Sequence, residues 1–142
     1  MTGGETLQAV LARIPYVRHL GAYAELAGDE MTAVLPFAEH LIGNPLLPAL
    51  HGGVIGGFME LTAVIQLSIV QPSNGGGPVR LPKPIDVTVE YLRSGRPVTT
   101  YARAEVKKVG RTIANVQVEA WQDARANPIA ALRGHFLVAA DD

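Results

Sequence analysis

His51, Gly52 and Gly53 stand together in the middle of the chain, and Glu60 follows nine residues after the histidine. These residue types suit attack on a carbonyl group. A carboxylate can attack the carbon or take a proton from water, and a glycine N–H can donate to the oxyanion that develops. The first N–H groups of a helix have no acceptor inside the helix and lie at the positive end of its dipole. The spacing therefore indicates a candidate catalytic site at a helix start.

The residues from 54 to 70 are predicted to form a helix that is apolar nearly all round, and such a helix is buried. Glu60 lies in its middle. Burying an unpaired carboxylate costs several kcal/mol of folding free energy, so a buried acid is usually protonated, paired with another group or functional. Gly53, Gly56 and Gly57 share one face with Glu60 at three- and four-residue spacing. We expect this bare face to allow close packing or to leave a slot beside Glu60.

Length and composition predict a single globular domain over residues 1–142. The chain is 48% hydrophobic and 18% charged, and its net charge of −1 favours neither nucleic acid nor an anionic membrane. It has no cysteine, which excludes disulfides, thiolate metal sites and a cysteine nucleophile. The N-terminus lacks the pattern of a signal peptide, and the apolar run 54–70 is short and polar for a membrane span. We therefore expect a cytoplasmic protein.

Apolar and polar residues alternate in the last sixty residues, which predicts half-buried strands. The expected elements are a helix at 6–14, strands at 20–27 and 31–35, a helical turn at 37–42, a loop at 43–48, the central helix, and strands at 85–91, 102–107, 114–120 and 129–138. One very apolar helix among antiparallel strands favours an α+β fold, with a single curved antiparallel sheet wrapped around one long central helix.

The sequence from Leu50 to Gly53, leading into this helix with an acid at the ninth position after the histidine, resembles the hotdog-fold acyl-CoA thioesterases of the phenylacetate-degradation type. The resemblance covers about residues 15–138 and includes the segments 85–92 and 107–111 and Gly95. It implies a hotdog fold and hydrolysis of an acyl- or aryl-CoA thioester to free acid and coenzyme A. Coenzyme A is then part of the substrate, and no other cofactor and no metal are expected.

The resemblance also implies roles for individual residues. Glu60 is expected to be the general base or nucleophile, and the Gly52 backbone N–H is expected to be the oxyanion donor. His51 is expected to belong to the same catalytic site, and Gly53 to bind the substrate. From the residues alone, His51 and Glu60 also have structural readings. The histidine could cap the helix or bond to a loop carbonyl, and the acid could bond to backbone or to an arginine.

Two family features are displaced in this chain. The family has a catalytic Asn or Gln about six residues before the histidine. Asn44 is the nearest candidate for that role here, but it lies seven residues before His51 and is followed by Pro45. Some relatives also carry a Ser or Thr one turn after the acid. Val64 occupies that place here, so this hydroxyl is either absent or supplied from elsewhere, with Thr62 and Ser68 as the substitutes.

Four basic residues are the candidates for binding the phosphates of coenzyme A, although each could be an ordinary solvated charge. They are Arg80, Lys83, Arg93 and Arg111.

Gly52 and Glu60 are too far apart to serve one reacting centre from one helix. Eight residues span about 12 Å along a helix axis, whereas both groups must come within about 3–3.5 Å of the reacting atoms or the attacking water. We therefore expect a homodimer or homotetramer with active sites between subunits.

Two other functions compete with thioester hydrolysis. His40, Gly43, Pro45 and Pro48 echo the motif that begins the catalytic segment of hotdog-fold hydroxyacyl-thioester dehydratases, but the acid of that family would fall on Val54. A non-catalytic acyl-thioester binding protein is the second alternative, and Glu60 argues against it.

Overall fold

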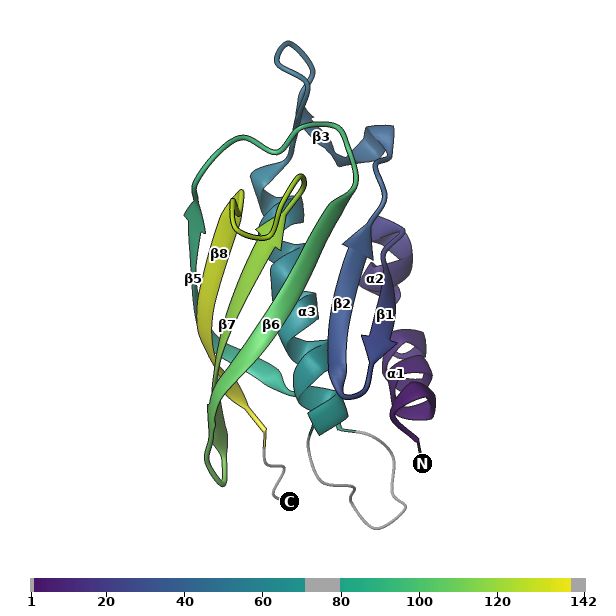
Figure 1. Ribbon diagram of the computed structural model, residues 1–142, viewed down its shortest axis with the longest axis vertical. Helices are drawn as coiled ribbons and strands as arrows, with labels where there is room; N and C mark the ends of the chain where they lie inside the picture. Colours follow the sequence, from purple (N-terminus) through teal and green to yellow (C-terminus); the bar gives the residue numbers. More distant parts are fainter. Residues whose placement is uncertain (1, 71–79, 139–142) are drawn as a thin grey trace.

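The computed structural model describes residues 2–70 and 80–138. It has the predicted α+β architecture (Figure 1). Its elements are α1 (Gly3–Ala12), α2 (Pro15–Leu20), β1 (Tyr23–Ala27), β2 (Glu30–Leu35), a 3-10 turn (Glu39–Leu41), β3 (Ile42–Asn44), β4 (Ala49–Leu50), α3 (Gly52–Val70), β5 (Lys83–Tyr91), β6 (Thr100–Val109), β7 (Ile113–Trp121) and β8 (Ala130–Leu137). The sequence did not predict α2. It begins with Pro15 and ends at Gly21, which adopts a φ of 75°, and both residues occupy positions typical of helix boundaries.

The main sheet has six antiparallel strands in the order β1-β2-β6-β7-β8-β5, and it curves around α3 (Figure 1). This confirms the predicted sheet and central helix. The strands β6, β7 and β8 follow one another as hairpins, whereas β5 pairs with β8 at the far edge of the sheet. β3 and β4 form a separate two-stranded hairpin that leads into α3.

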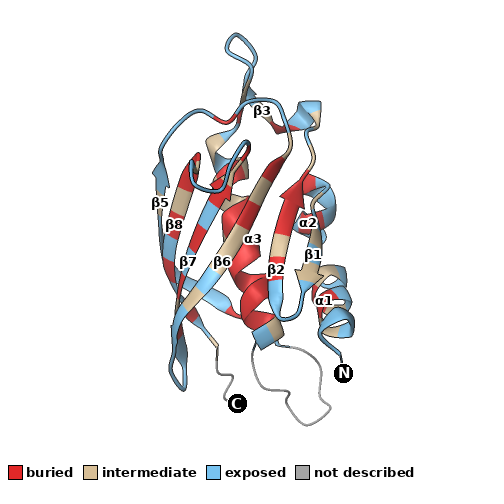
Figure 2. Ribbon diagram, viewed as in Figure 1, coloured by how far each residue is buried: buried red, intermediate tan, exposed pale blue. Residues whose placement is uncertain are grey.

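The core lies between α3 and the inner face of the sheet, as the burial colours show (Figure 2). On the sheet side, small residues such as Ala102, Ala114 and Ala120 are completely buried, so the helix can approach the strands closely. On the helix side, Phe58 and Met59 are buried. By length and composition α3 could cross a membrane, but more than half of it is buried inside this domain.

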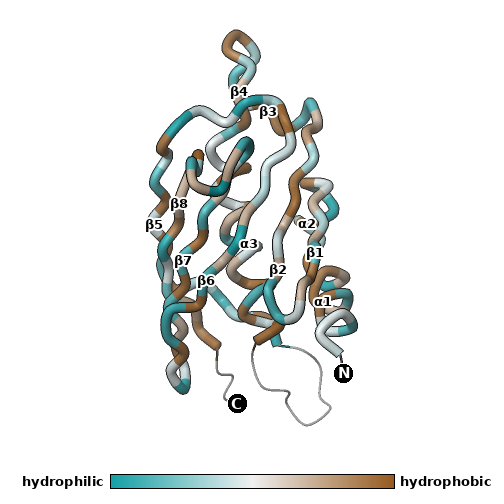
Figure 3. The backbone as a smooth tube through the Cα atoms, viewed as in Figure 1, coloured by the Kyte–Doolittle hydropathy of each residue, from teal (hydrophilic) through white to brown (hydrophobic). Residues whose placement is uncertain are grey.

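The edge strand β5 departs from the sequence expectation. Its alternation predicted one buried face, yet Ile85 is 53% exposed and Tyr91 is 55% exposed. Apolar and polar residues alternate along this outer strand (Figure 3). A single helix about 10 Å wide cannot cover six strands spaced about 4.8 Å apart. β5 is therefore left with an apolar face that this chain does not bury.

Gln66 fixes α3 to the turn between β1 and β2. Its side-chain oxygen accepts from the N–H of Met31 at 2.9 Å, and its amide nitrogen donates to the carbonyl of Asp29 at 2.8 Å. Met31 is completely buried, so no water can replace the oxygen of Gln66.

Replacing Gln66 with Leu should therefore destabilise the protein. The change keeps an apolar volume in the core but leaves the buried Met31 N–H without an acceptor, which costs about 1–3 kcal/mol. Urea unfolding measures this loss as a lower midpoint. Gln8→Leu, on the exposed side of α1, is the matched control and should change little. Equal midpoints for the two variants would show that the Gln66 hydrogen bonds contribute no net stability.

Candidate active site

The β3–β4 hairpin and its neighbours determine where α3 begins. The N–H of Leu50 donates to the carbonyl of Gly95 at 2.9 Å, and the N–H of His51 donates to the carbonyl of Leu41 at 2.9 Å. These two bonds fix the backbone at Leu50 and His51, the two residues that lead into the helix. The position of Gly52 is thus set by segments that lie far apart in the sequence.

Gly43 allows this hairpin to approach His51. A Cβ atom on Gly43 would lie 2.7 Å from Cα of His51, which is closer than real side chains come to backbone atoms. The two prolines in residues 43–48 predict a loop there. The structure instead has two short paired strands around residues 45–48, and no sequence signal indicated why residue 43 must be glycine.

His51 caps the helix, which is one of the two structural roles that the sequence suggested for it. Its Nδ1 accepts from the N–H of Gly53 at 2.8 Å, and its carbonyl accepts from the N–H of Val54 at 3.0 Å. Because Nδ1 is an acceptor, the neutral ring carries its proton on Nε2. Within residues 2–70 and 80–138, the Gly52 N–H has no acceptor. The helix start thus offers one unpaired donor, at the residue that the sequence indicated.

The glycine face of α3 is used for close packing by two tyrosines. A Cβ on Gly57 would lie 3.1 Å from the ring of Tyr16, and a Cβ on Gly52 or Gly56 would lie 3.5 or 3.4 Å from Tyr91. The hydroxyl of Tyr91 also donates to the carbonyl of Gly52 at 2.8 Å. Close packing is therefore one use of this face, and the sequence did not reveal either tyrosine as its partner.

Glu60 lies on the same face and is half-buried rather than fully buried. It has no hydrogen bond or ion pair with any residue in the described part of the chain. The carboxylate therefore has no structural partner of the kind that a mid-helix acid could have had. Partial exposure also lets water reach it, which a base that activates water requires.

The two substitute hydroxyls face elsewhere. The hydroxyl of Thr62 donates to the carbonyl of Phe58 at 2.8 Å, and that of Ser68 donates to the carbonyl of Val64 at 2.8 Å. Both side chains are buried and bonded to their own helix. The suggestion that either one assists Glu60 is therefore wrong.

Asn44 lies at the end of β3, where its side-chain oxygen accepts from the N–H groups of Leu46 and Leu47 at 3.1 and 3.4 Å. This contact shapes the turn of the hairpin, and the amide nitrogen of Asn44 remains without an acceptor among the described residues. Asn44 thus has a structural use, which accounts for an asparagine before Pro45.

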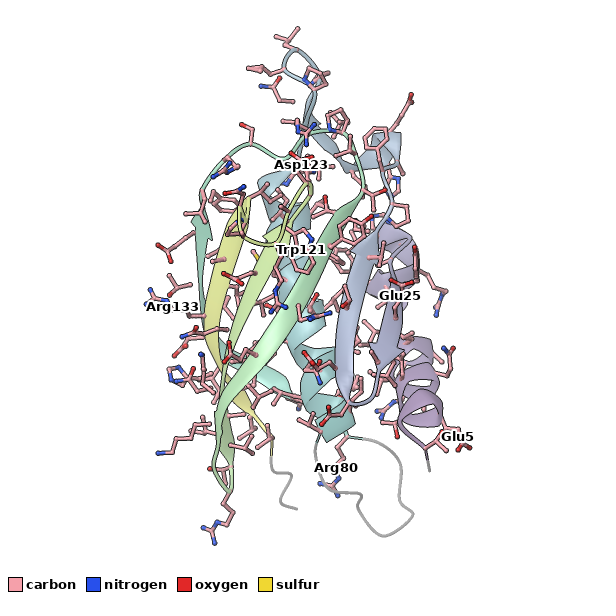
Figure 4. All side chains as sticks on the ribbon, in the orientation of Figure 1. Glu5, Glu25, Arg80, Trp121, Asp123 and Arg133 are labelled. Atoms are coloured by element: carbon pink, nitrogen blue, oxygen red, sulfur yellow. The ribbon has the colours of Figure 1, made fainter. Side chains whose placement is uncertain are left out.

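The four basic candidates do not gather at one place in one chain. Lys83 and Arg111 lie at the same end of the sheet. Lys83 is paired with Leu137 of β8, and Leu137 is also paired with Ile113, which follows the turn that holds Arg111. Arg80 lies just before β5, below the end of α3 (Figure 4). Arg93 follows the other end of β5. There it lines a surface depression of about 380 Å³ together with Gly52 and Tyr91.

Metal-binding side chains do not cluster in the described ranges, where no group of three or more His, Cys, Asp or Glu residues could hold an ion. His19 and His40 do lie together, with ring centroids 5.2 Å apart, and Nε2 of His40 bonds to the carbonyl of His19 at 2.8 Å.

Comparison with known proteins agrees with this geometry. The model of the thioesterase superfamily matches residues 47–129, which is more than half of the chain. A protein from Chromobacterium violaceum is 38% identical, with a TM-score of 0.73 over 95% of this chain and 90% of that one. A protein from Pseudomonas aeruginosa is 27% identical, with a TM-score of 0.80 over 95% and 98%. No curated protein matches the chain.

The same fold occurs in the PaaI protein of the Escherichia coli phenylacetic acid degradation operon. The two chains are 14% identical, with a TM-score of 0.80 over 97% of this chain and 94% of PaaI. At that identity the likeness concerns the fold alone. Together with the family match, it confirms the hotdog architecture expected from the sequence. The chain belongs to the thioesterase superfamily and is a thioester hydrolase.

Proposed function

We propose that this protein hydrolyses an acyl- or aryl-CoA thioester at sites formed between two copies of the chain. The Gly52 N–H of one subunit is the oxyanion donor, and the Glu60 carboxylate of the other is the general base or nucleophile. One observation carries the proposal. The Gly52 N–H is unpaired among the described residues while its neighbour on Gly53 is bonded to His51.

The chemistry follows from these two groups. As a base, Glu60 takes a proton from water, whose oxygen attacks the thioester carbon, and the carbonyl electrons move onto an oxyanion near the Gly52 N–H. The carbonyl then re-forms, the carbon–sulfur bond breaks, and the thiolate takes the proton from Glu60. As a nucleophile, the carboxylate forms a mixed anhydride with release of the thiolate, and water then hydrolyses the anhydride. Both routes need the same placement of Gly52 and Glu60.

The edge strand β5 supports pairing of two chains. It is nine residues long, β8 is its only partner strand within residues 2–70 and 80–138, and Ile85 and Tyr91 on its apolar face are more than half exposed. Such an edge tends to pair with another chain. Antiparallel pairing of two β5 strands would continue the sheet and place the two α3 helices side by side in opposite directions.

The contacts of β5 indicate where a two-fold axis would serve the site. Gly56 is midway between Gly52 and Glu60, and a Cβ on Gly56 would lie 3.8 Å from a methyl group of Val89. An axis at the level of Val89 therefore brings Gly52 of one chain level with Glu60 of the partner subunit. The same antiparallel pairing brings the Lys83 end of one strand toward the Tyr91 end of the other. Arg93 could then join basic residues from the partner at the coenzyme A phosphates.

The catalytic role of Glu60 is tested by Glu60→Gln, which keeps the shape of the side chain but can neither take a proton nor attack carbon. The variant should fold normally and lose at least about a hundredfold in kcat. The assay follows release of free coenzyme A with a thiol-trapping dye over aryl, short-chain and medium-chain acyl-CoAs.

Glu25→Gln, an exposed acid on β1, is the matched control and should retain full activity. Near-normal turnover in folded Glu60→Gln would remove Glu60 from the mechanism. No release of coenzyme A from any substrate by the unmodified protein would contradict the proposed hydrolysis itself.

Sharing of the site between chains is tested by mixing two inactive variants, Glu60→Gln and Gly52→Pro. Proline fits the first position of a helix and removes the N–H. If sites are composite, a heterodimer has one site with both lesions and one site with neither. Two-fold symmetry then predicts recovery of about half the activity of a normal dimer for each heterodimer formed.

Each variant mixed with itself is the control and should recover nothing. Verified heterodimers of two folded variants that remain inactive would mean that each site lies within a single chain.

A further inference from the structure

The peptide group between Gly52 and Gly53 is held at both ends. Its carbonyl oxygen accepts from the hydroxyl of Tyr91 at 2.8 Å, and its N–H donates to Nδ1 of His51 at 2.8 Å. Tyr91 is the last residue of β5, thirty-nine positions away in the sequence, and His51 is the residue just before the helix. A single peptide thus links the edge strand to the imidazole at the helix start.

We propose that Tyr91 is a positioning residue for the thioesterase site, acting on His51 and on the Gly52 donor through this peptide. The inference rests on the proposed function and adds a residue outside the His-Gly-Gly segment and Glu60. Tyr91 contacts no reacting atom in this scheme.

Cooperative hydrogen bonding is the first reason. A donor on the carbonyl oxygen polarises the peptide and strengthens the N–H at its other end as a donor. The Tyr91 hydroxyl therefore strengthens the bond from Gly53 to Nδ1 of His51. This bond keeps the ring in one orientation with its proton on Nε2, and Nε2 has no partner among the described residues.

Steric fit is the second reason. Tyr91 packs against the first turn of α3, since a Cβ on Gly52 would be in van der Waals contact with its ring at 3.5 Å and a Cβ on Gly56 with its hydroxyl at 3.4 Å. It also forms part of the depression of about 380 Å³ that Gly52 and Arg93 line. The ring and the hydroxyl together limit movement of the first turn of α3. The unpaired Gly52 N–H therefore keeps the direction that an oxyanion donor needs.

A simpler role for Tyr91 would be to fasten β5 to α3. If Tyr91 has only that structural role, loss of its hydroxyl changes the stability of the fold. If it is a positioning residue, the loss also changes the hydrogen-bond donors at the helix start. The two roles can be separated by removing only the hydroxyl, with kcat, KM and the Gly53 amide proton as the measured quantities.

Tyr91→Phe should lower kcat by about three- to tenfold, the effect of losing one hydrogen bond of ordinary strength. KM for acyl-CoA should stay the same. In the NMR spectrum the Gly53 amide proton should move upfield, because its bond to His51 weakens. Tyr101→Phe, which removes the hydroxyl from a ring stacked on Trp121, is the matched control and should change none of these quantities.

A second variant keeps the aromatic hydroxyl and strengthens it as a donor. Incorporating 3-fluorotyrosine at position 91 makes the hydroxyl more acidic, so below the pH at which it ionises the Gly53 amide proton should move downfield, opposite to Tyr91→Phe. This measurement does not depend on turnover.

Unchanged kcat in folded Tyr91→Phe would overturn the positioning role, even if stability fell. If the unmodified protein hydrolysed no acyl-CoA, the proposed function would fail, and the amide measurements would still decide the link through the peptide. A Gly53 amide proton that stays in place in both variants would overturn that link.

Discussion

The rest of the site depends on the N–H of Gly52 at the start of α3, which has no acceptor in the described part of the chain. A helix start always has donors without acceptors, but here one of them is left available while the groups around it are fixed. His51 takes the next N–H, Leu41 and Gly95 hold the preceding backbone, and Tyr91 binds the carbonyl. A rigid donor stabilises a developing charge without having to reorganise, so these surrounding contacts serve the chemistry as well as the fold.

Under the proposed function, the rigidity of α3 means that one chain cannot bring both Gly52 and Glu60 to one thioester. A straight helix holds Gly52 and Glu60 about 12 Å apart, and no loop movement can shorten that distance. The exposed apolar face of β5 arises from the same architecture, because a single helix cannot cover a six-stranded sheet. Pairing of two β5 edges would bury that face and bring the two halves of the site together, so one event would contribute both stability and activity.

Local patterns in the sequence were enough to predict most of the long elements, but not the short α2, β3 and β4 or how distant segments meet. Alternation identified the strands at 102–107 and 114–120, and uniform apolarity identified α3. The edge position of β5 could not be foreseen, because periodicity carries no information on strand order. Gly43 and Tyr91 were missed for a similar reason. Their importance lies in contacts with His51 and Gly52 across the fold, whereas Glu60 was conspicuous as a lone acid in an apolar run.

The most direct test of the account is a crystal structure of Glu60→Gln with a bound acyl-CoA. The account predicts that the thioester carbonyl oxygen lies about 3 Å from the Gly52 nitrogen of one chain. Residue 60 beside the carbonyl carbon should belong to the partner subunit. A carbonyl group far from Gly52, or residues 52 and 60 from the same chain at one thioester, would contradict it.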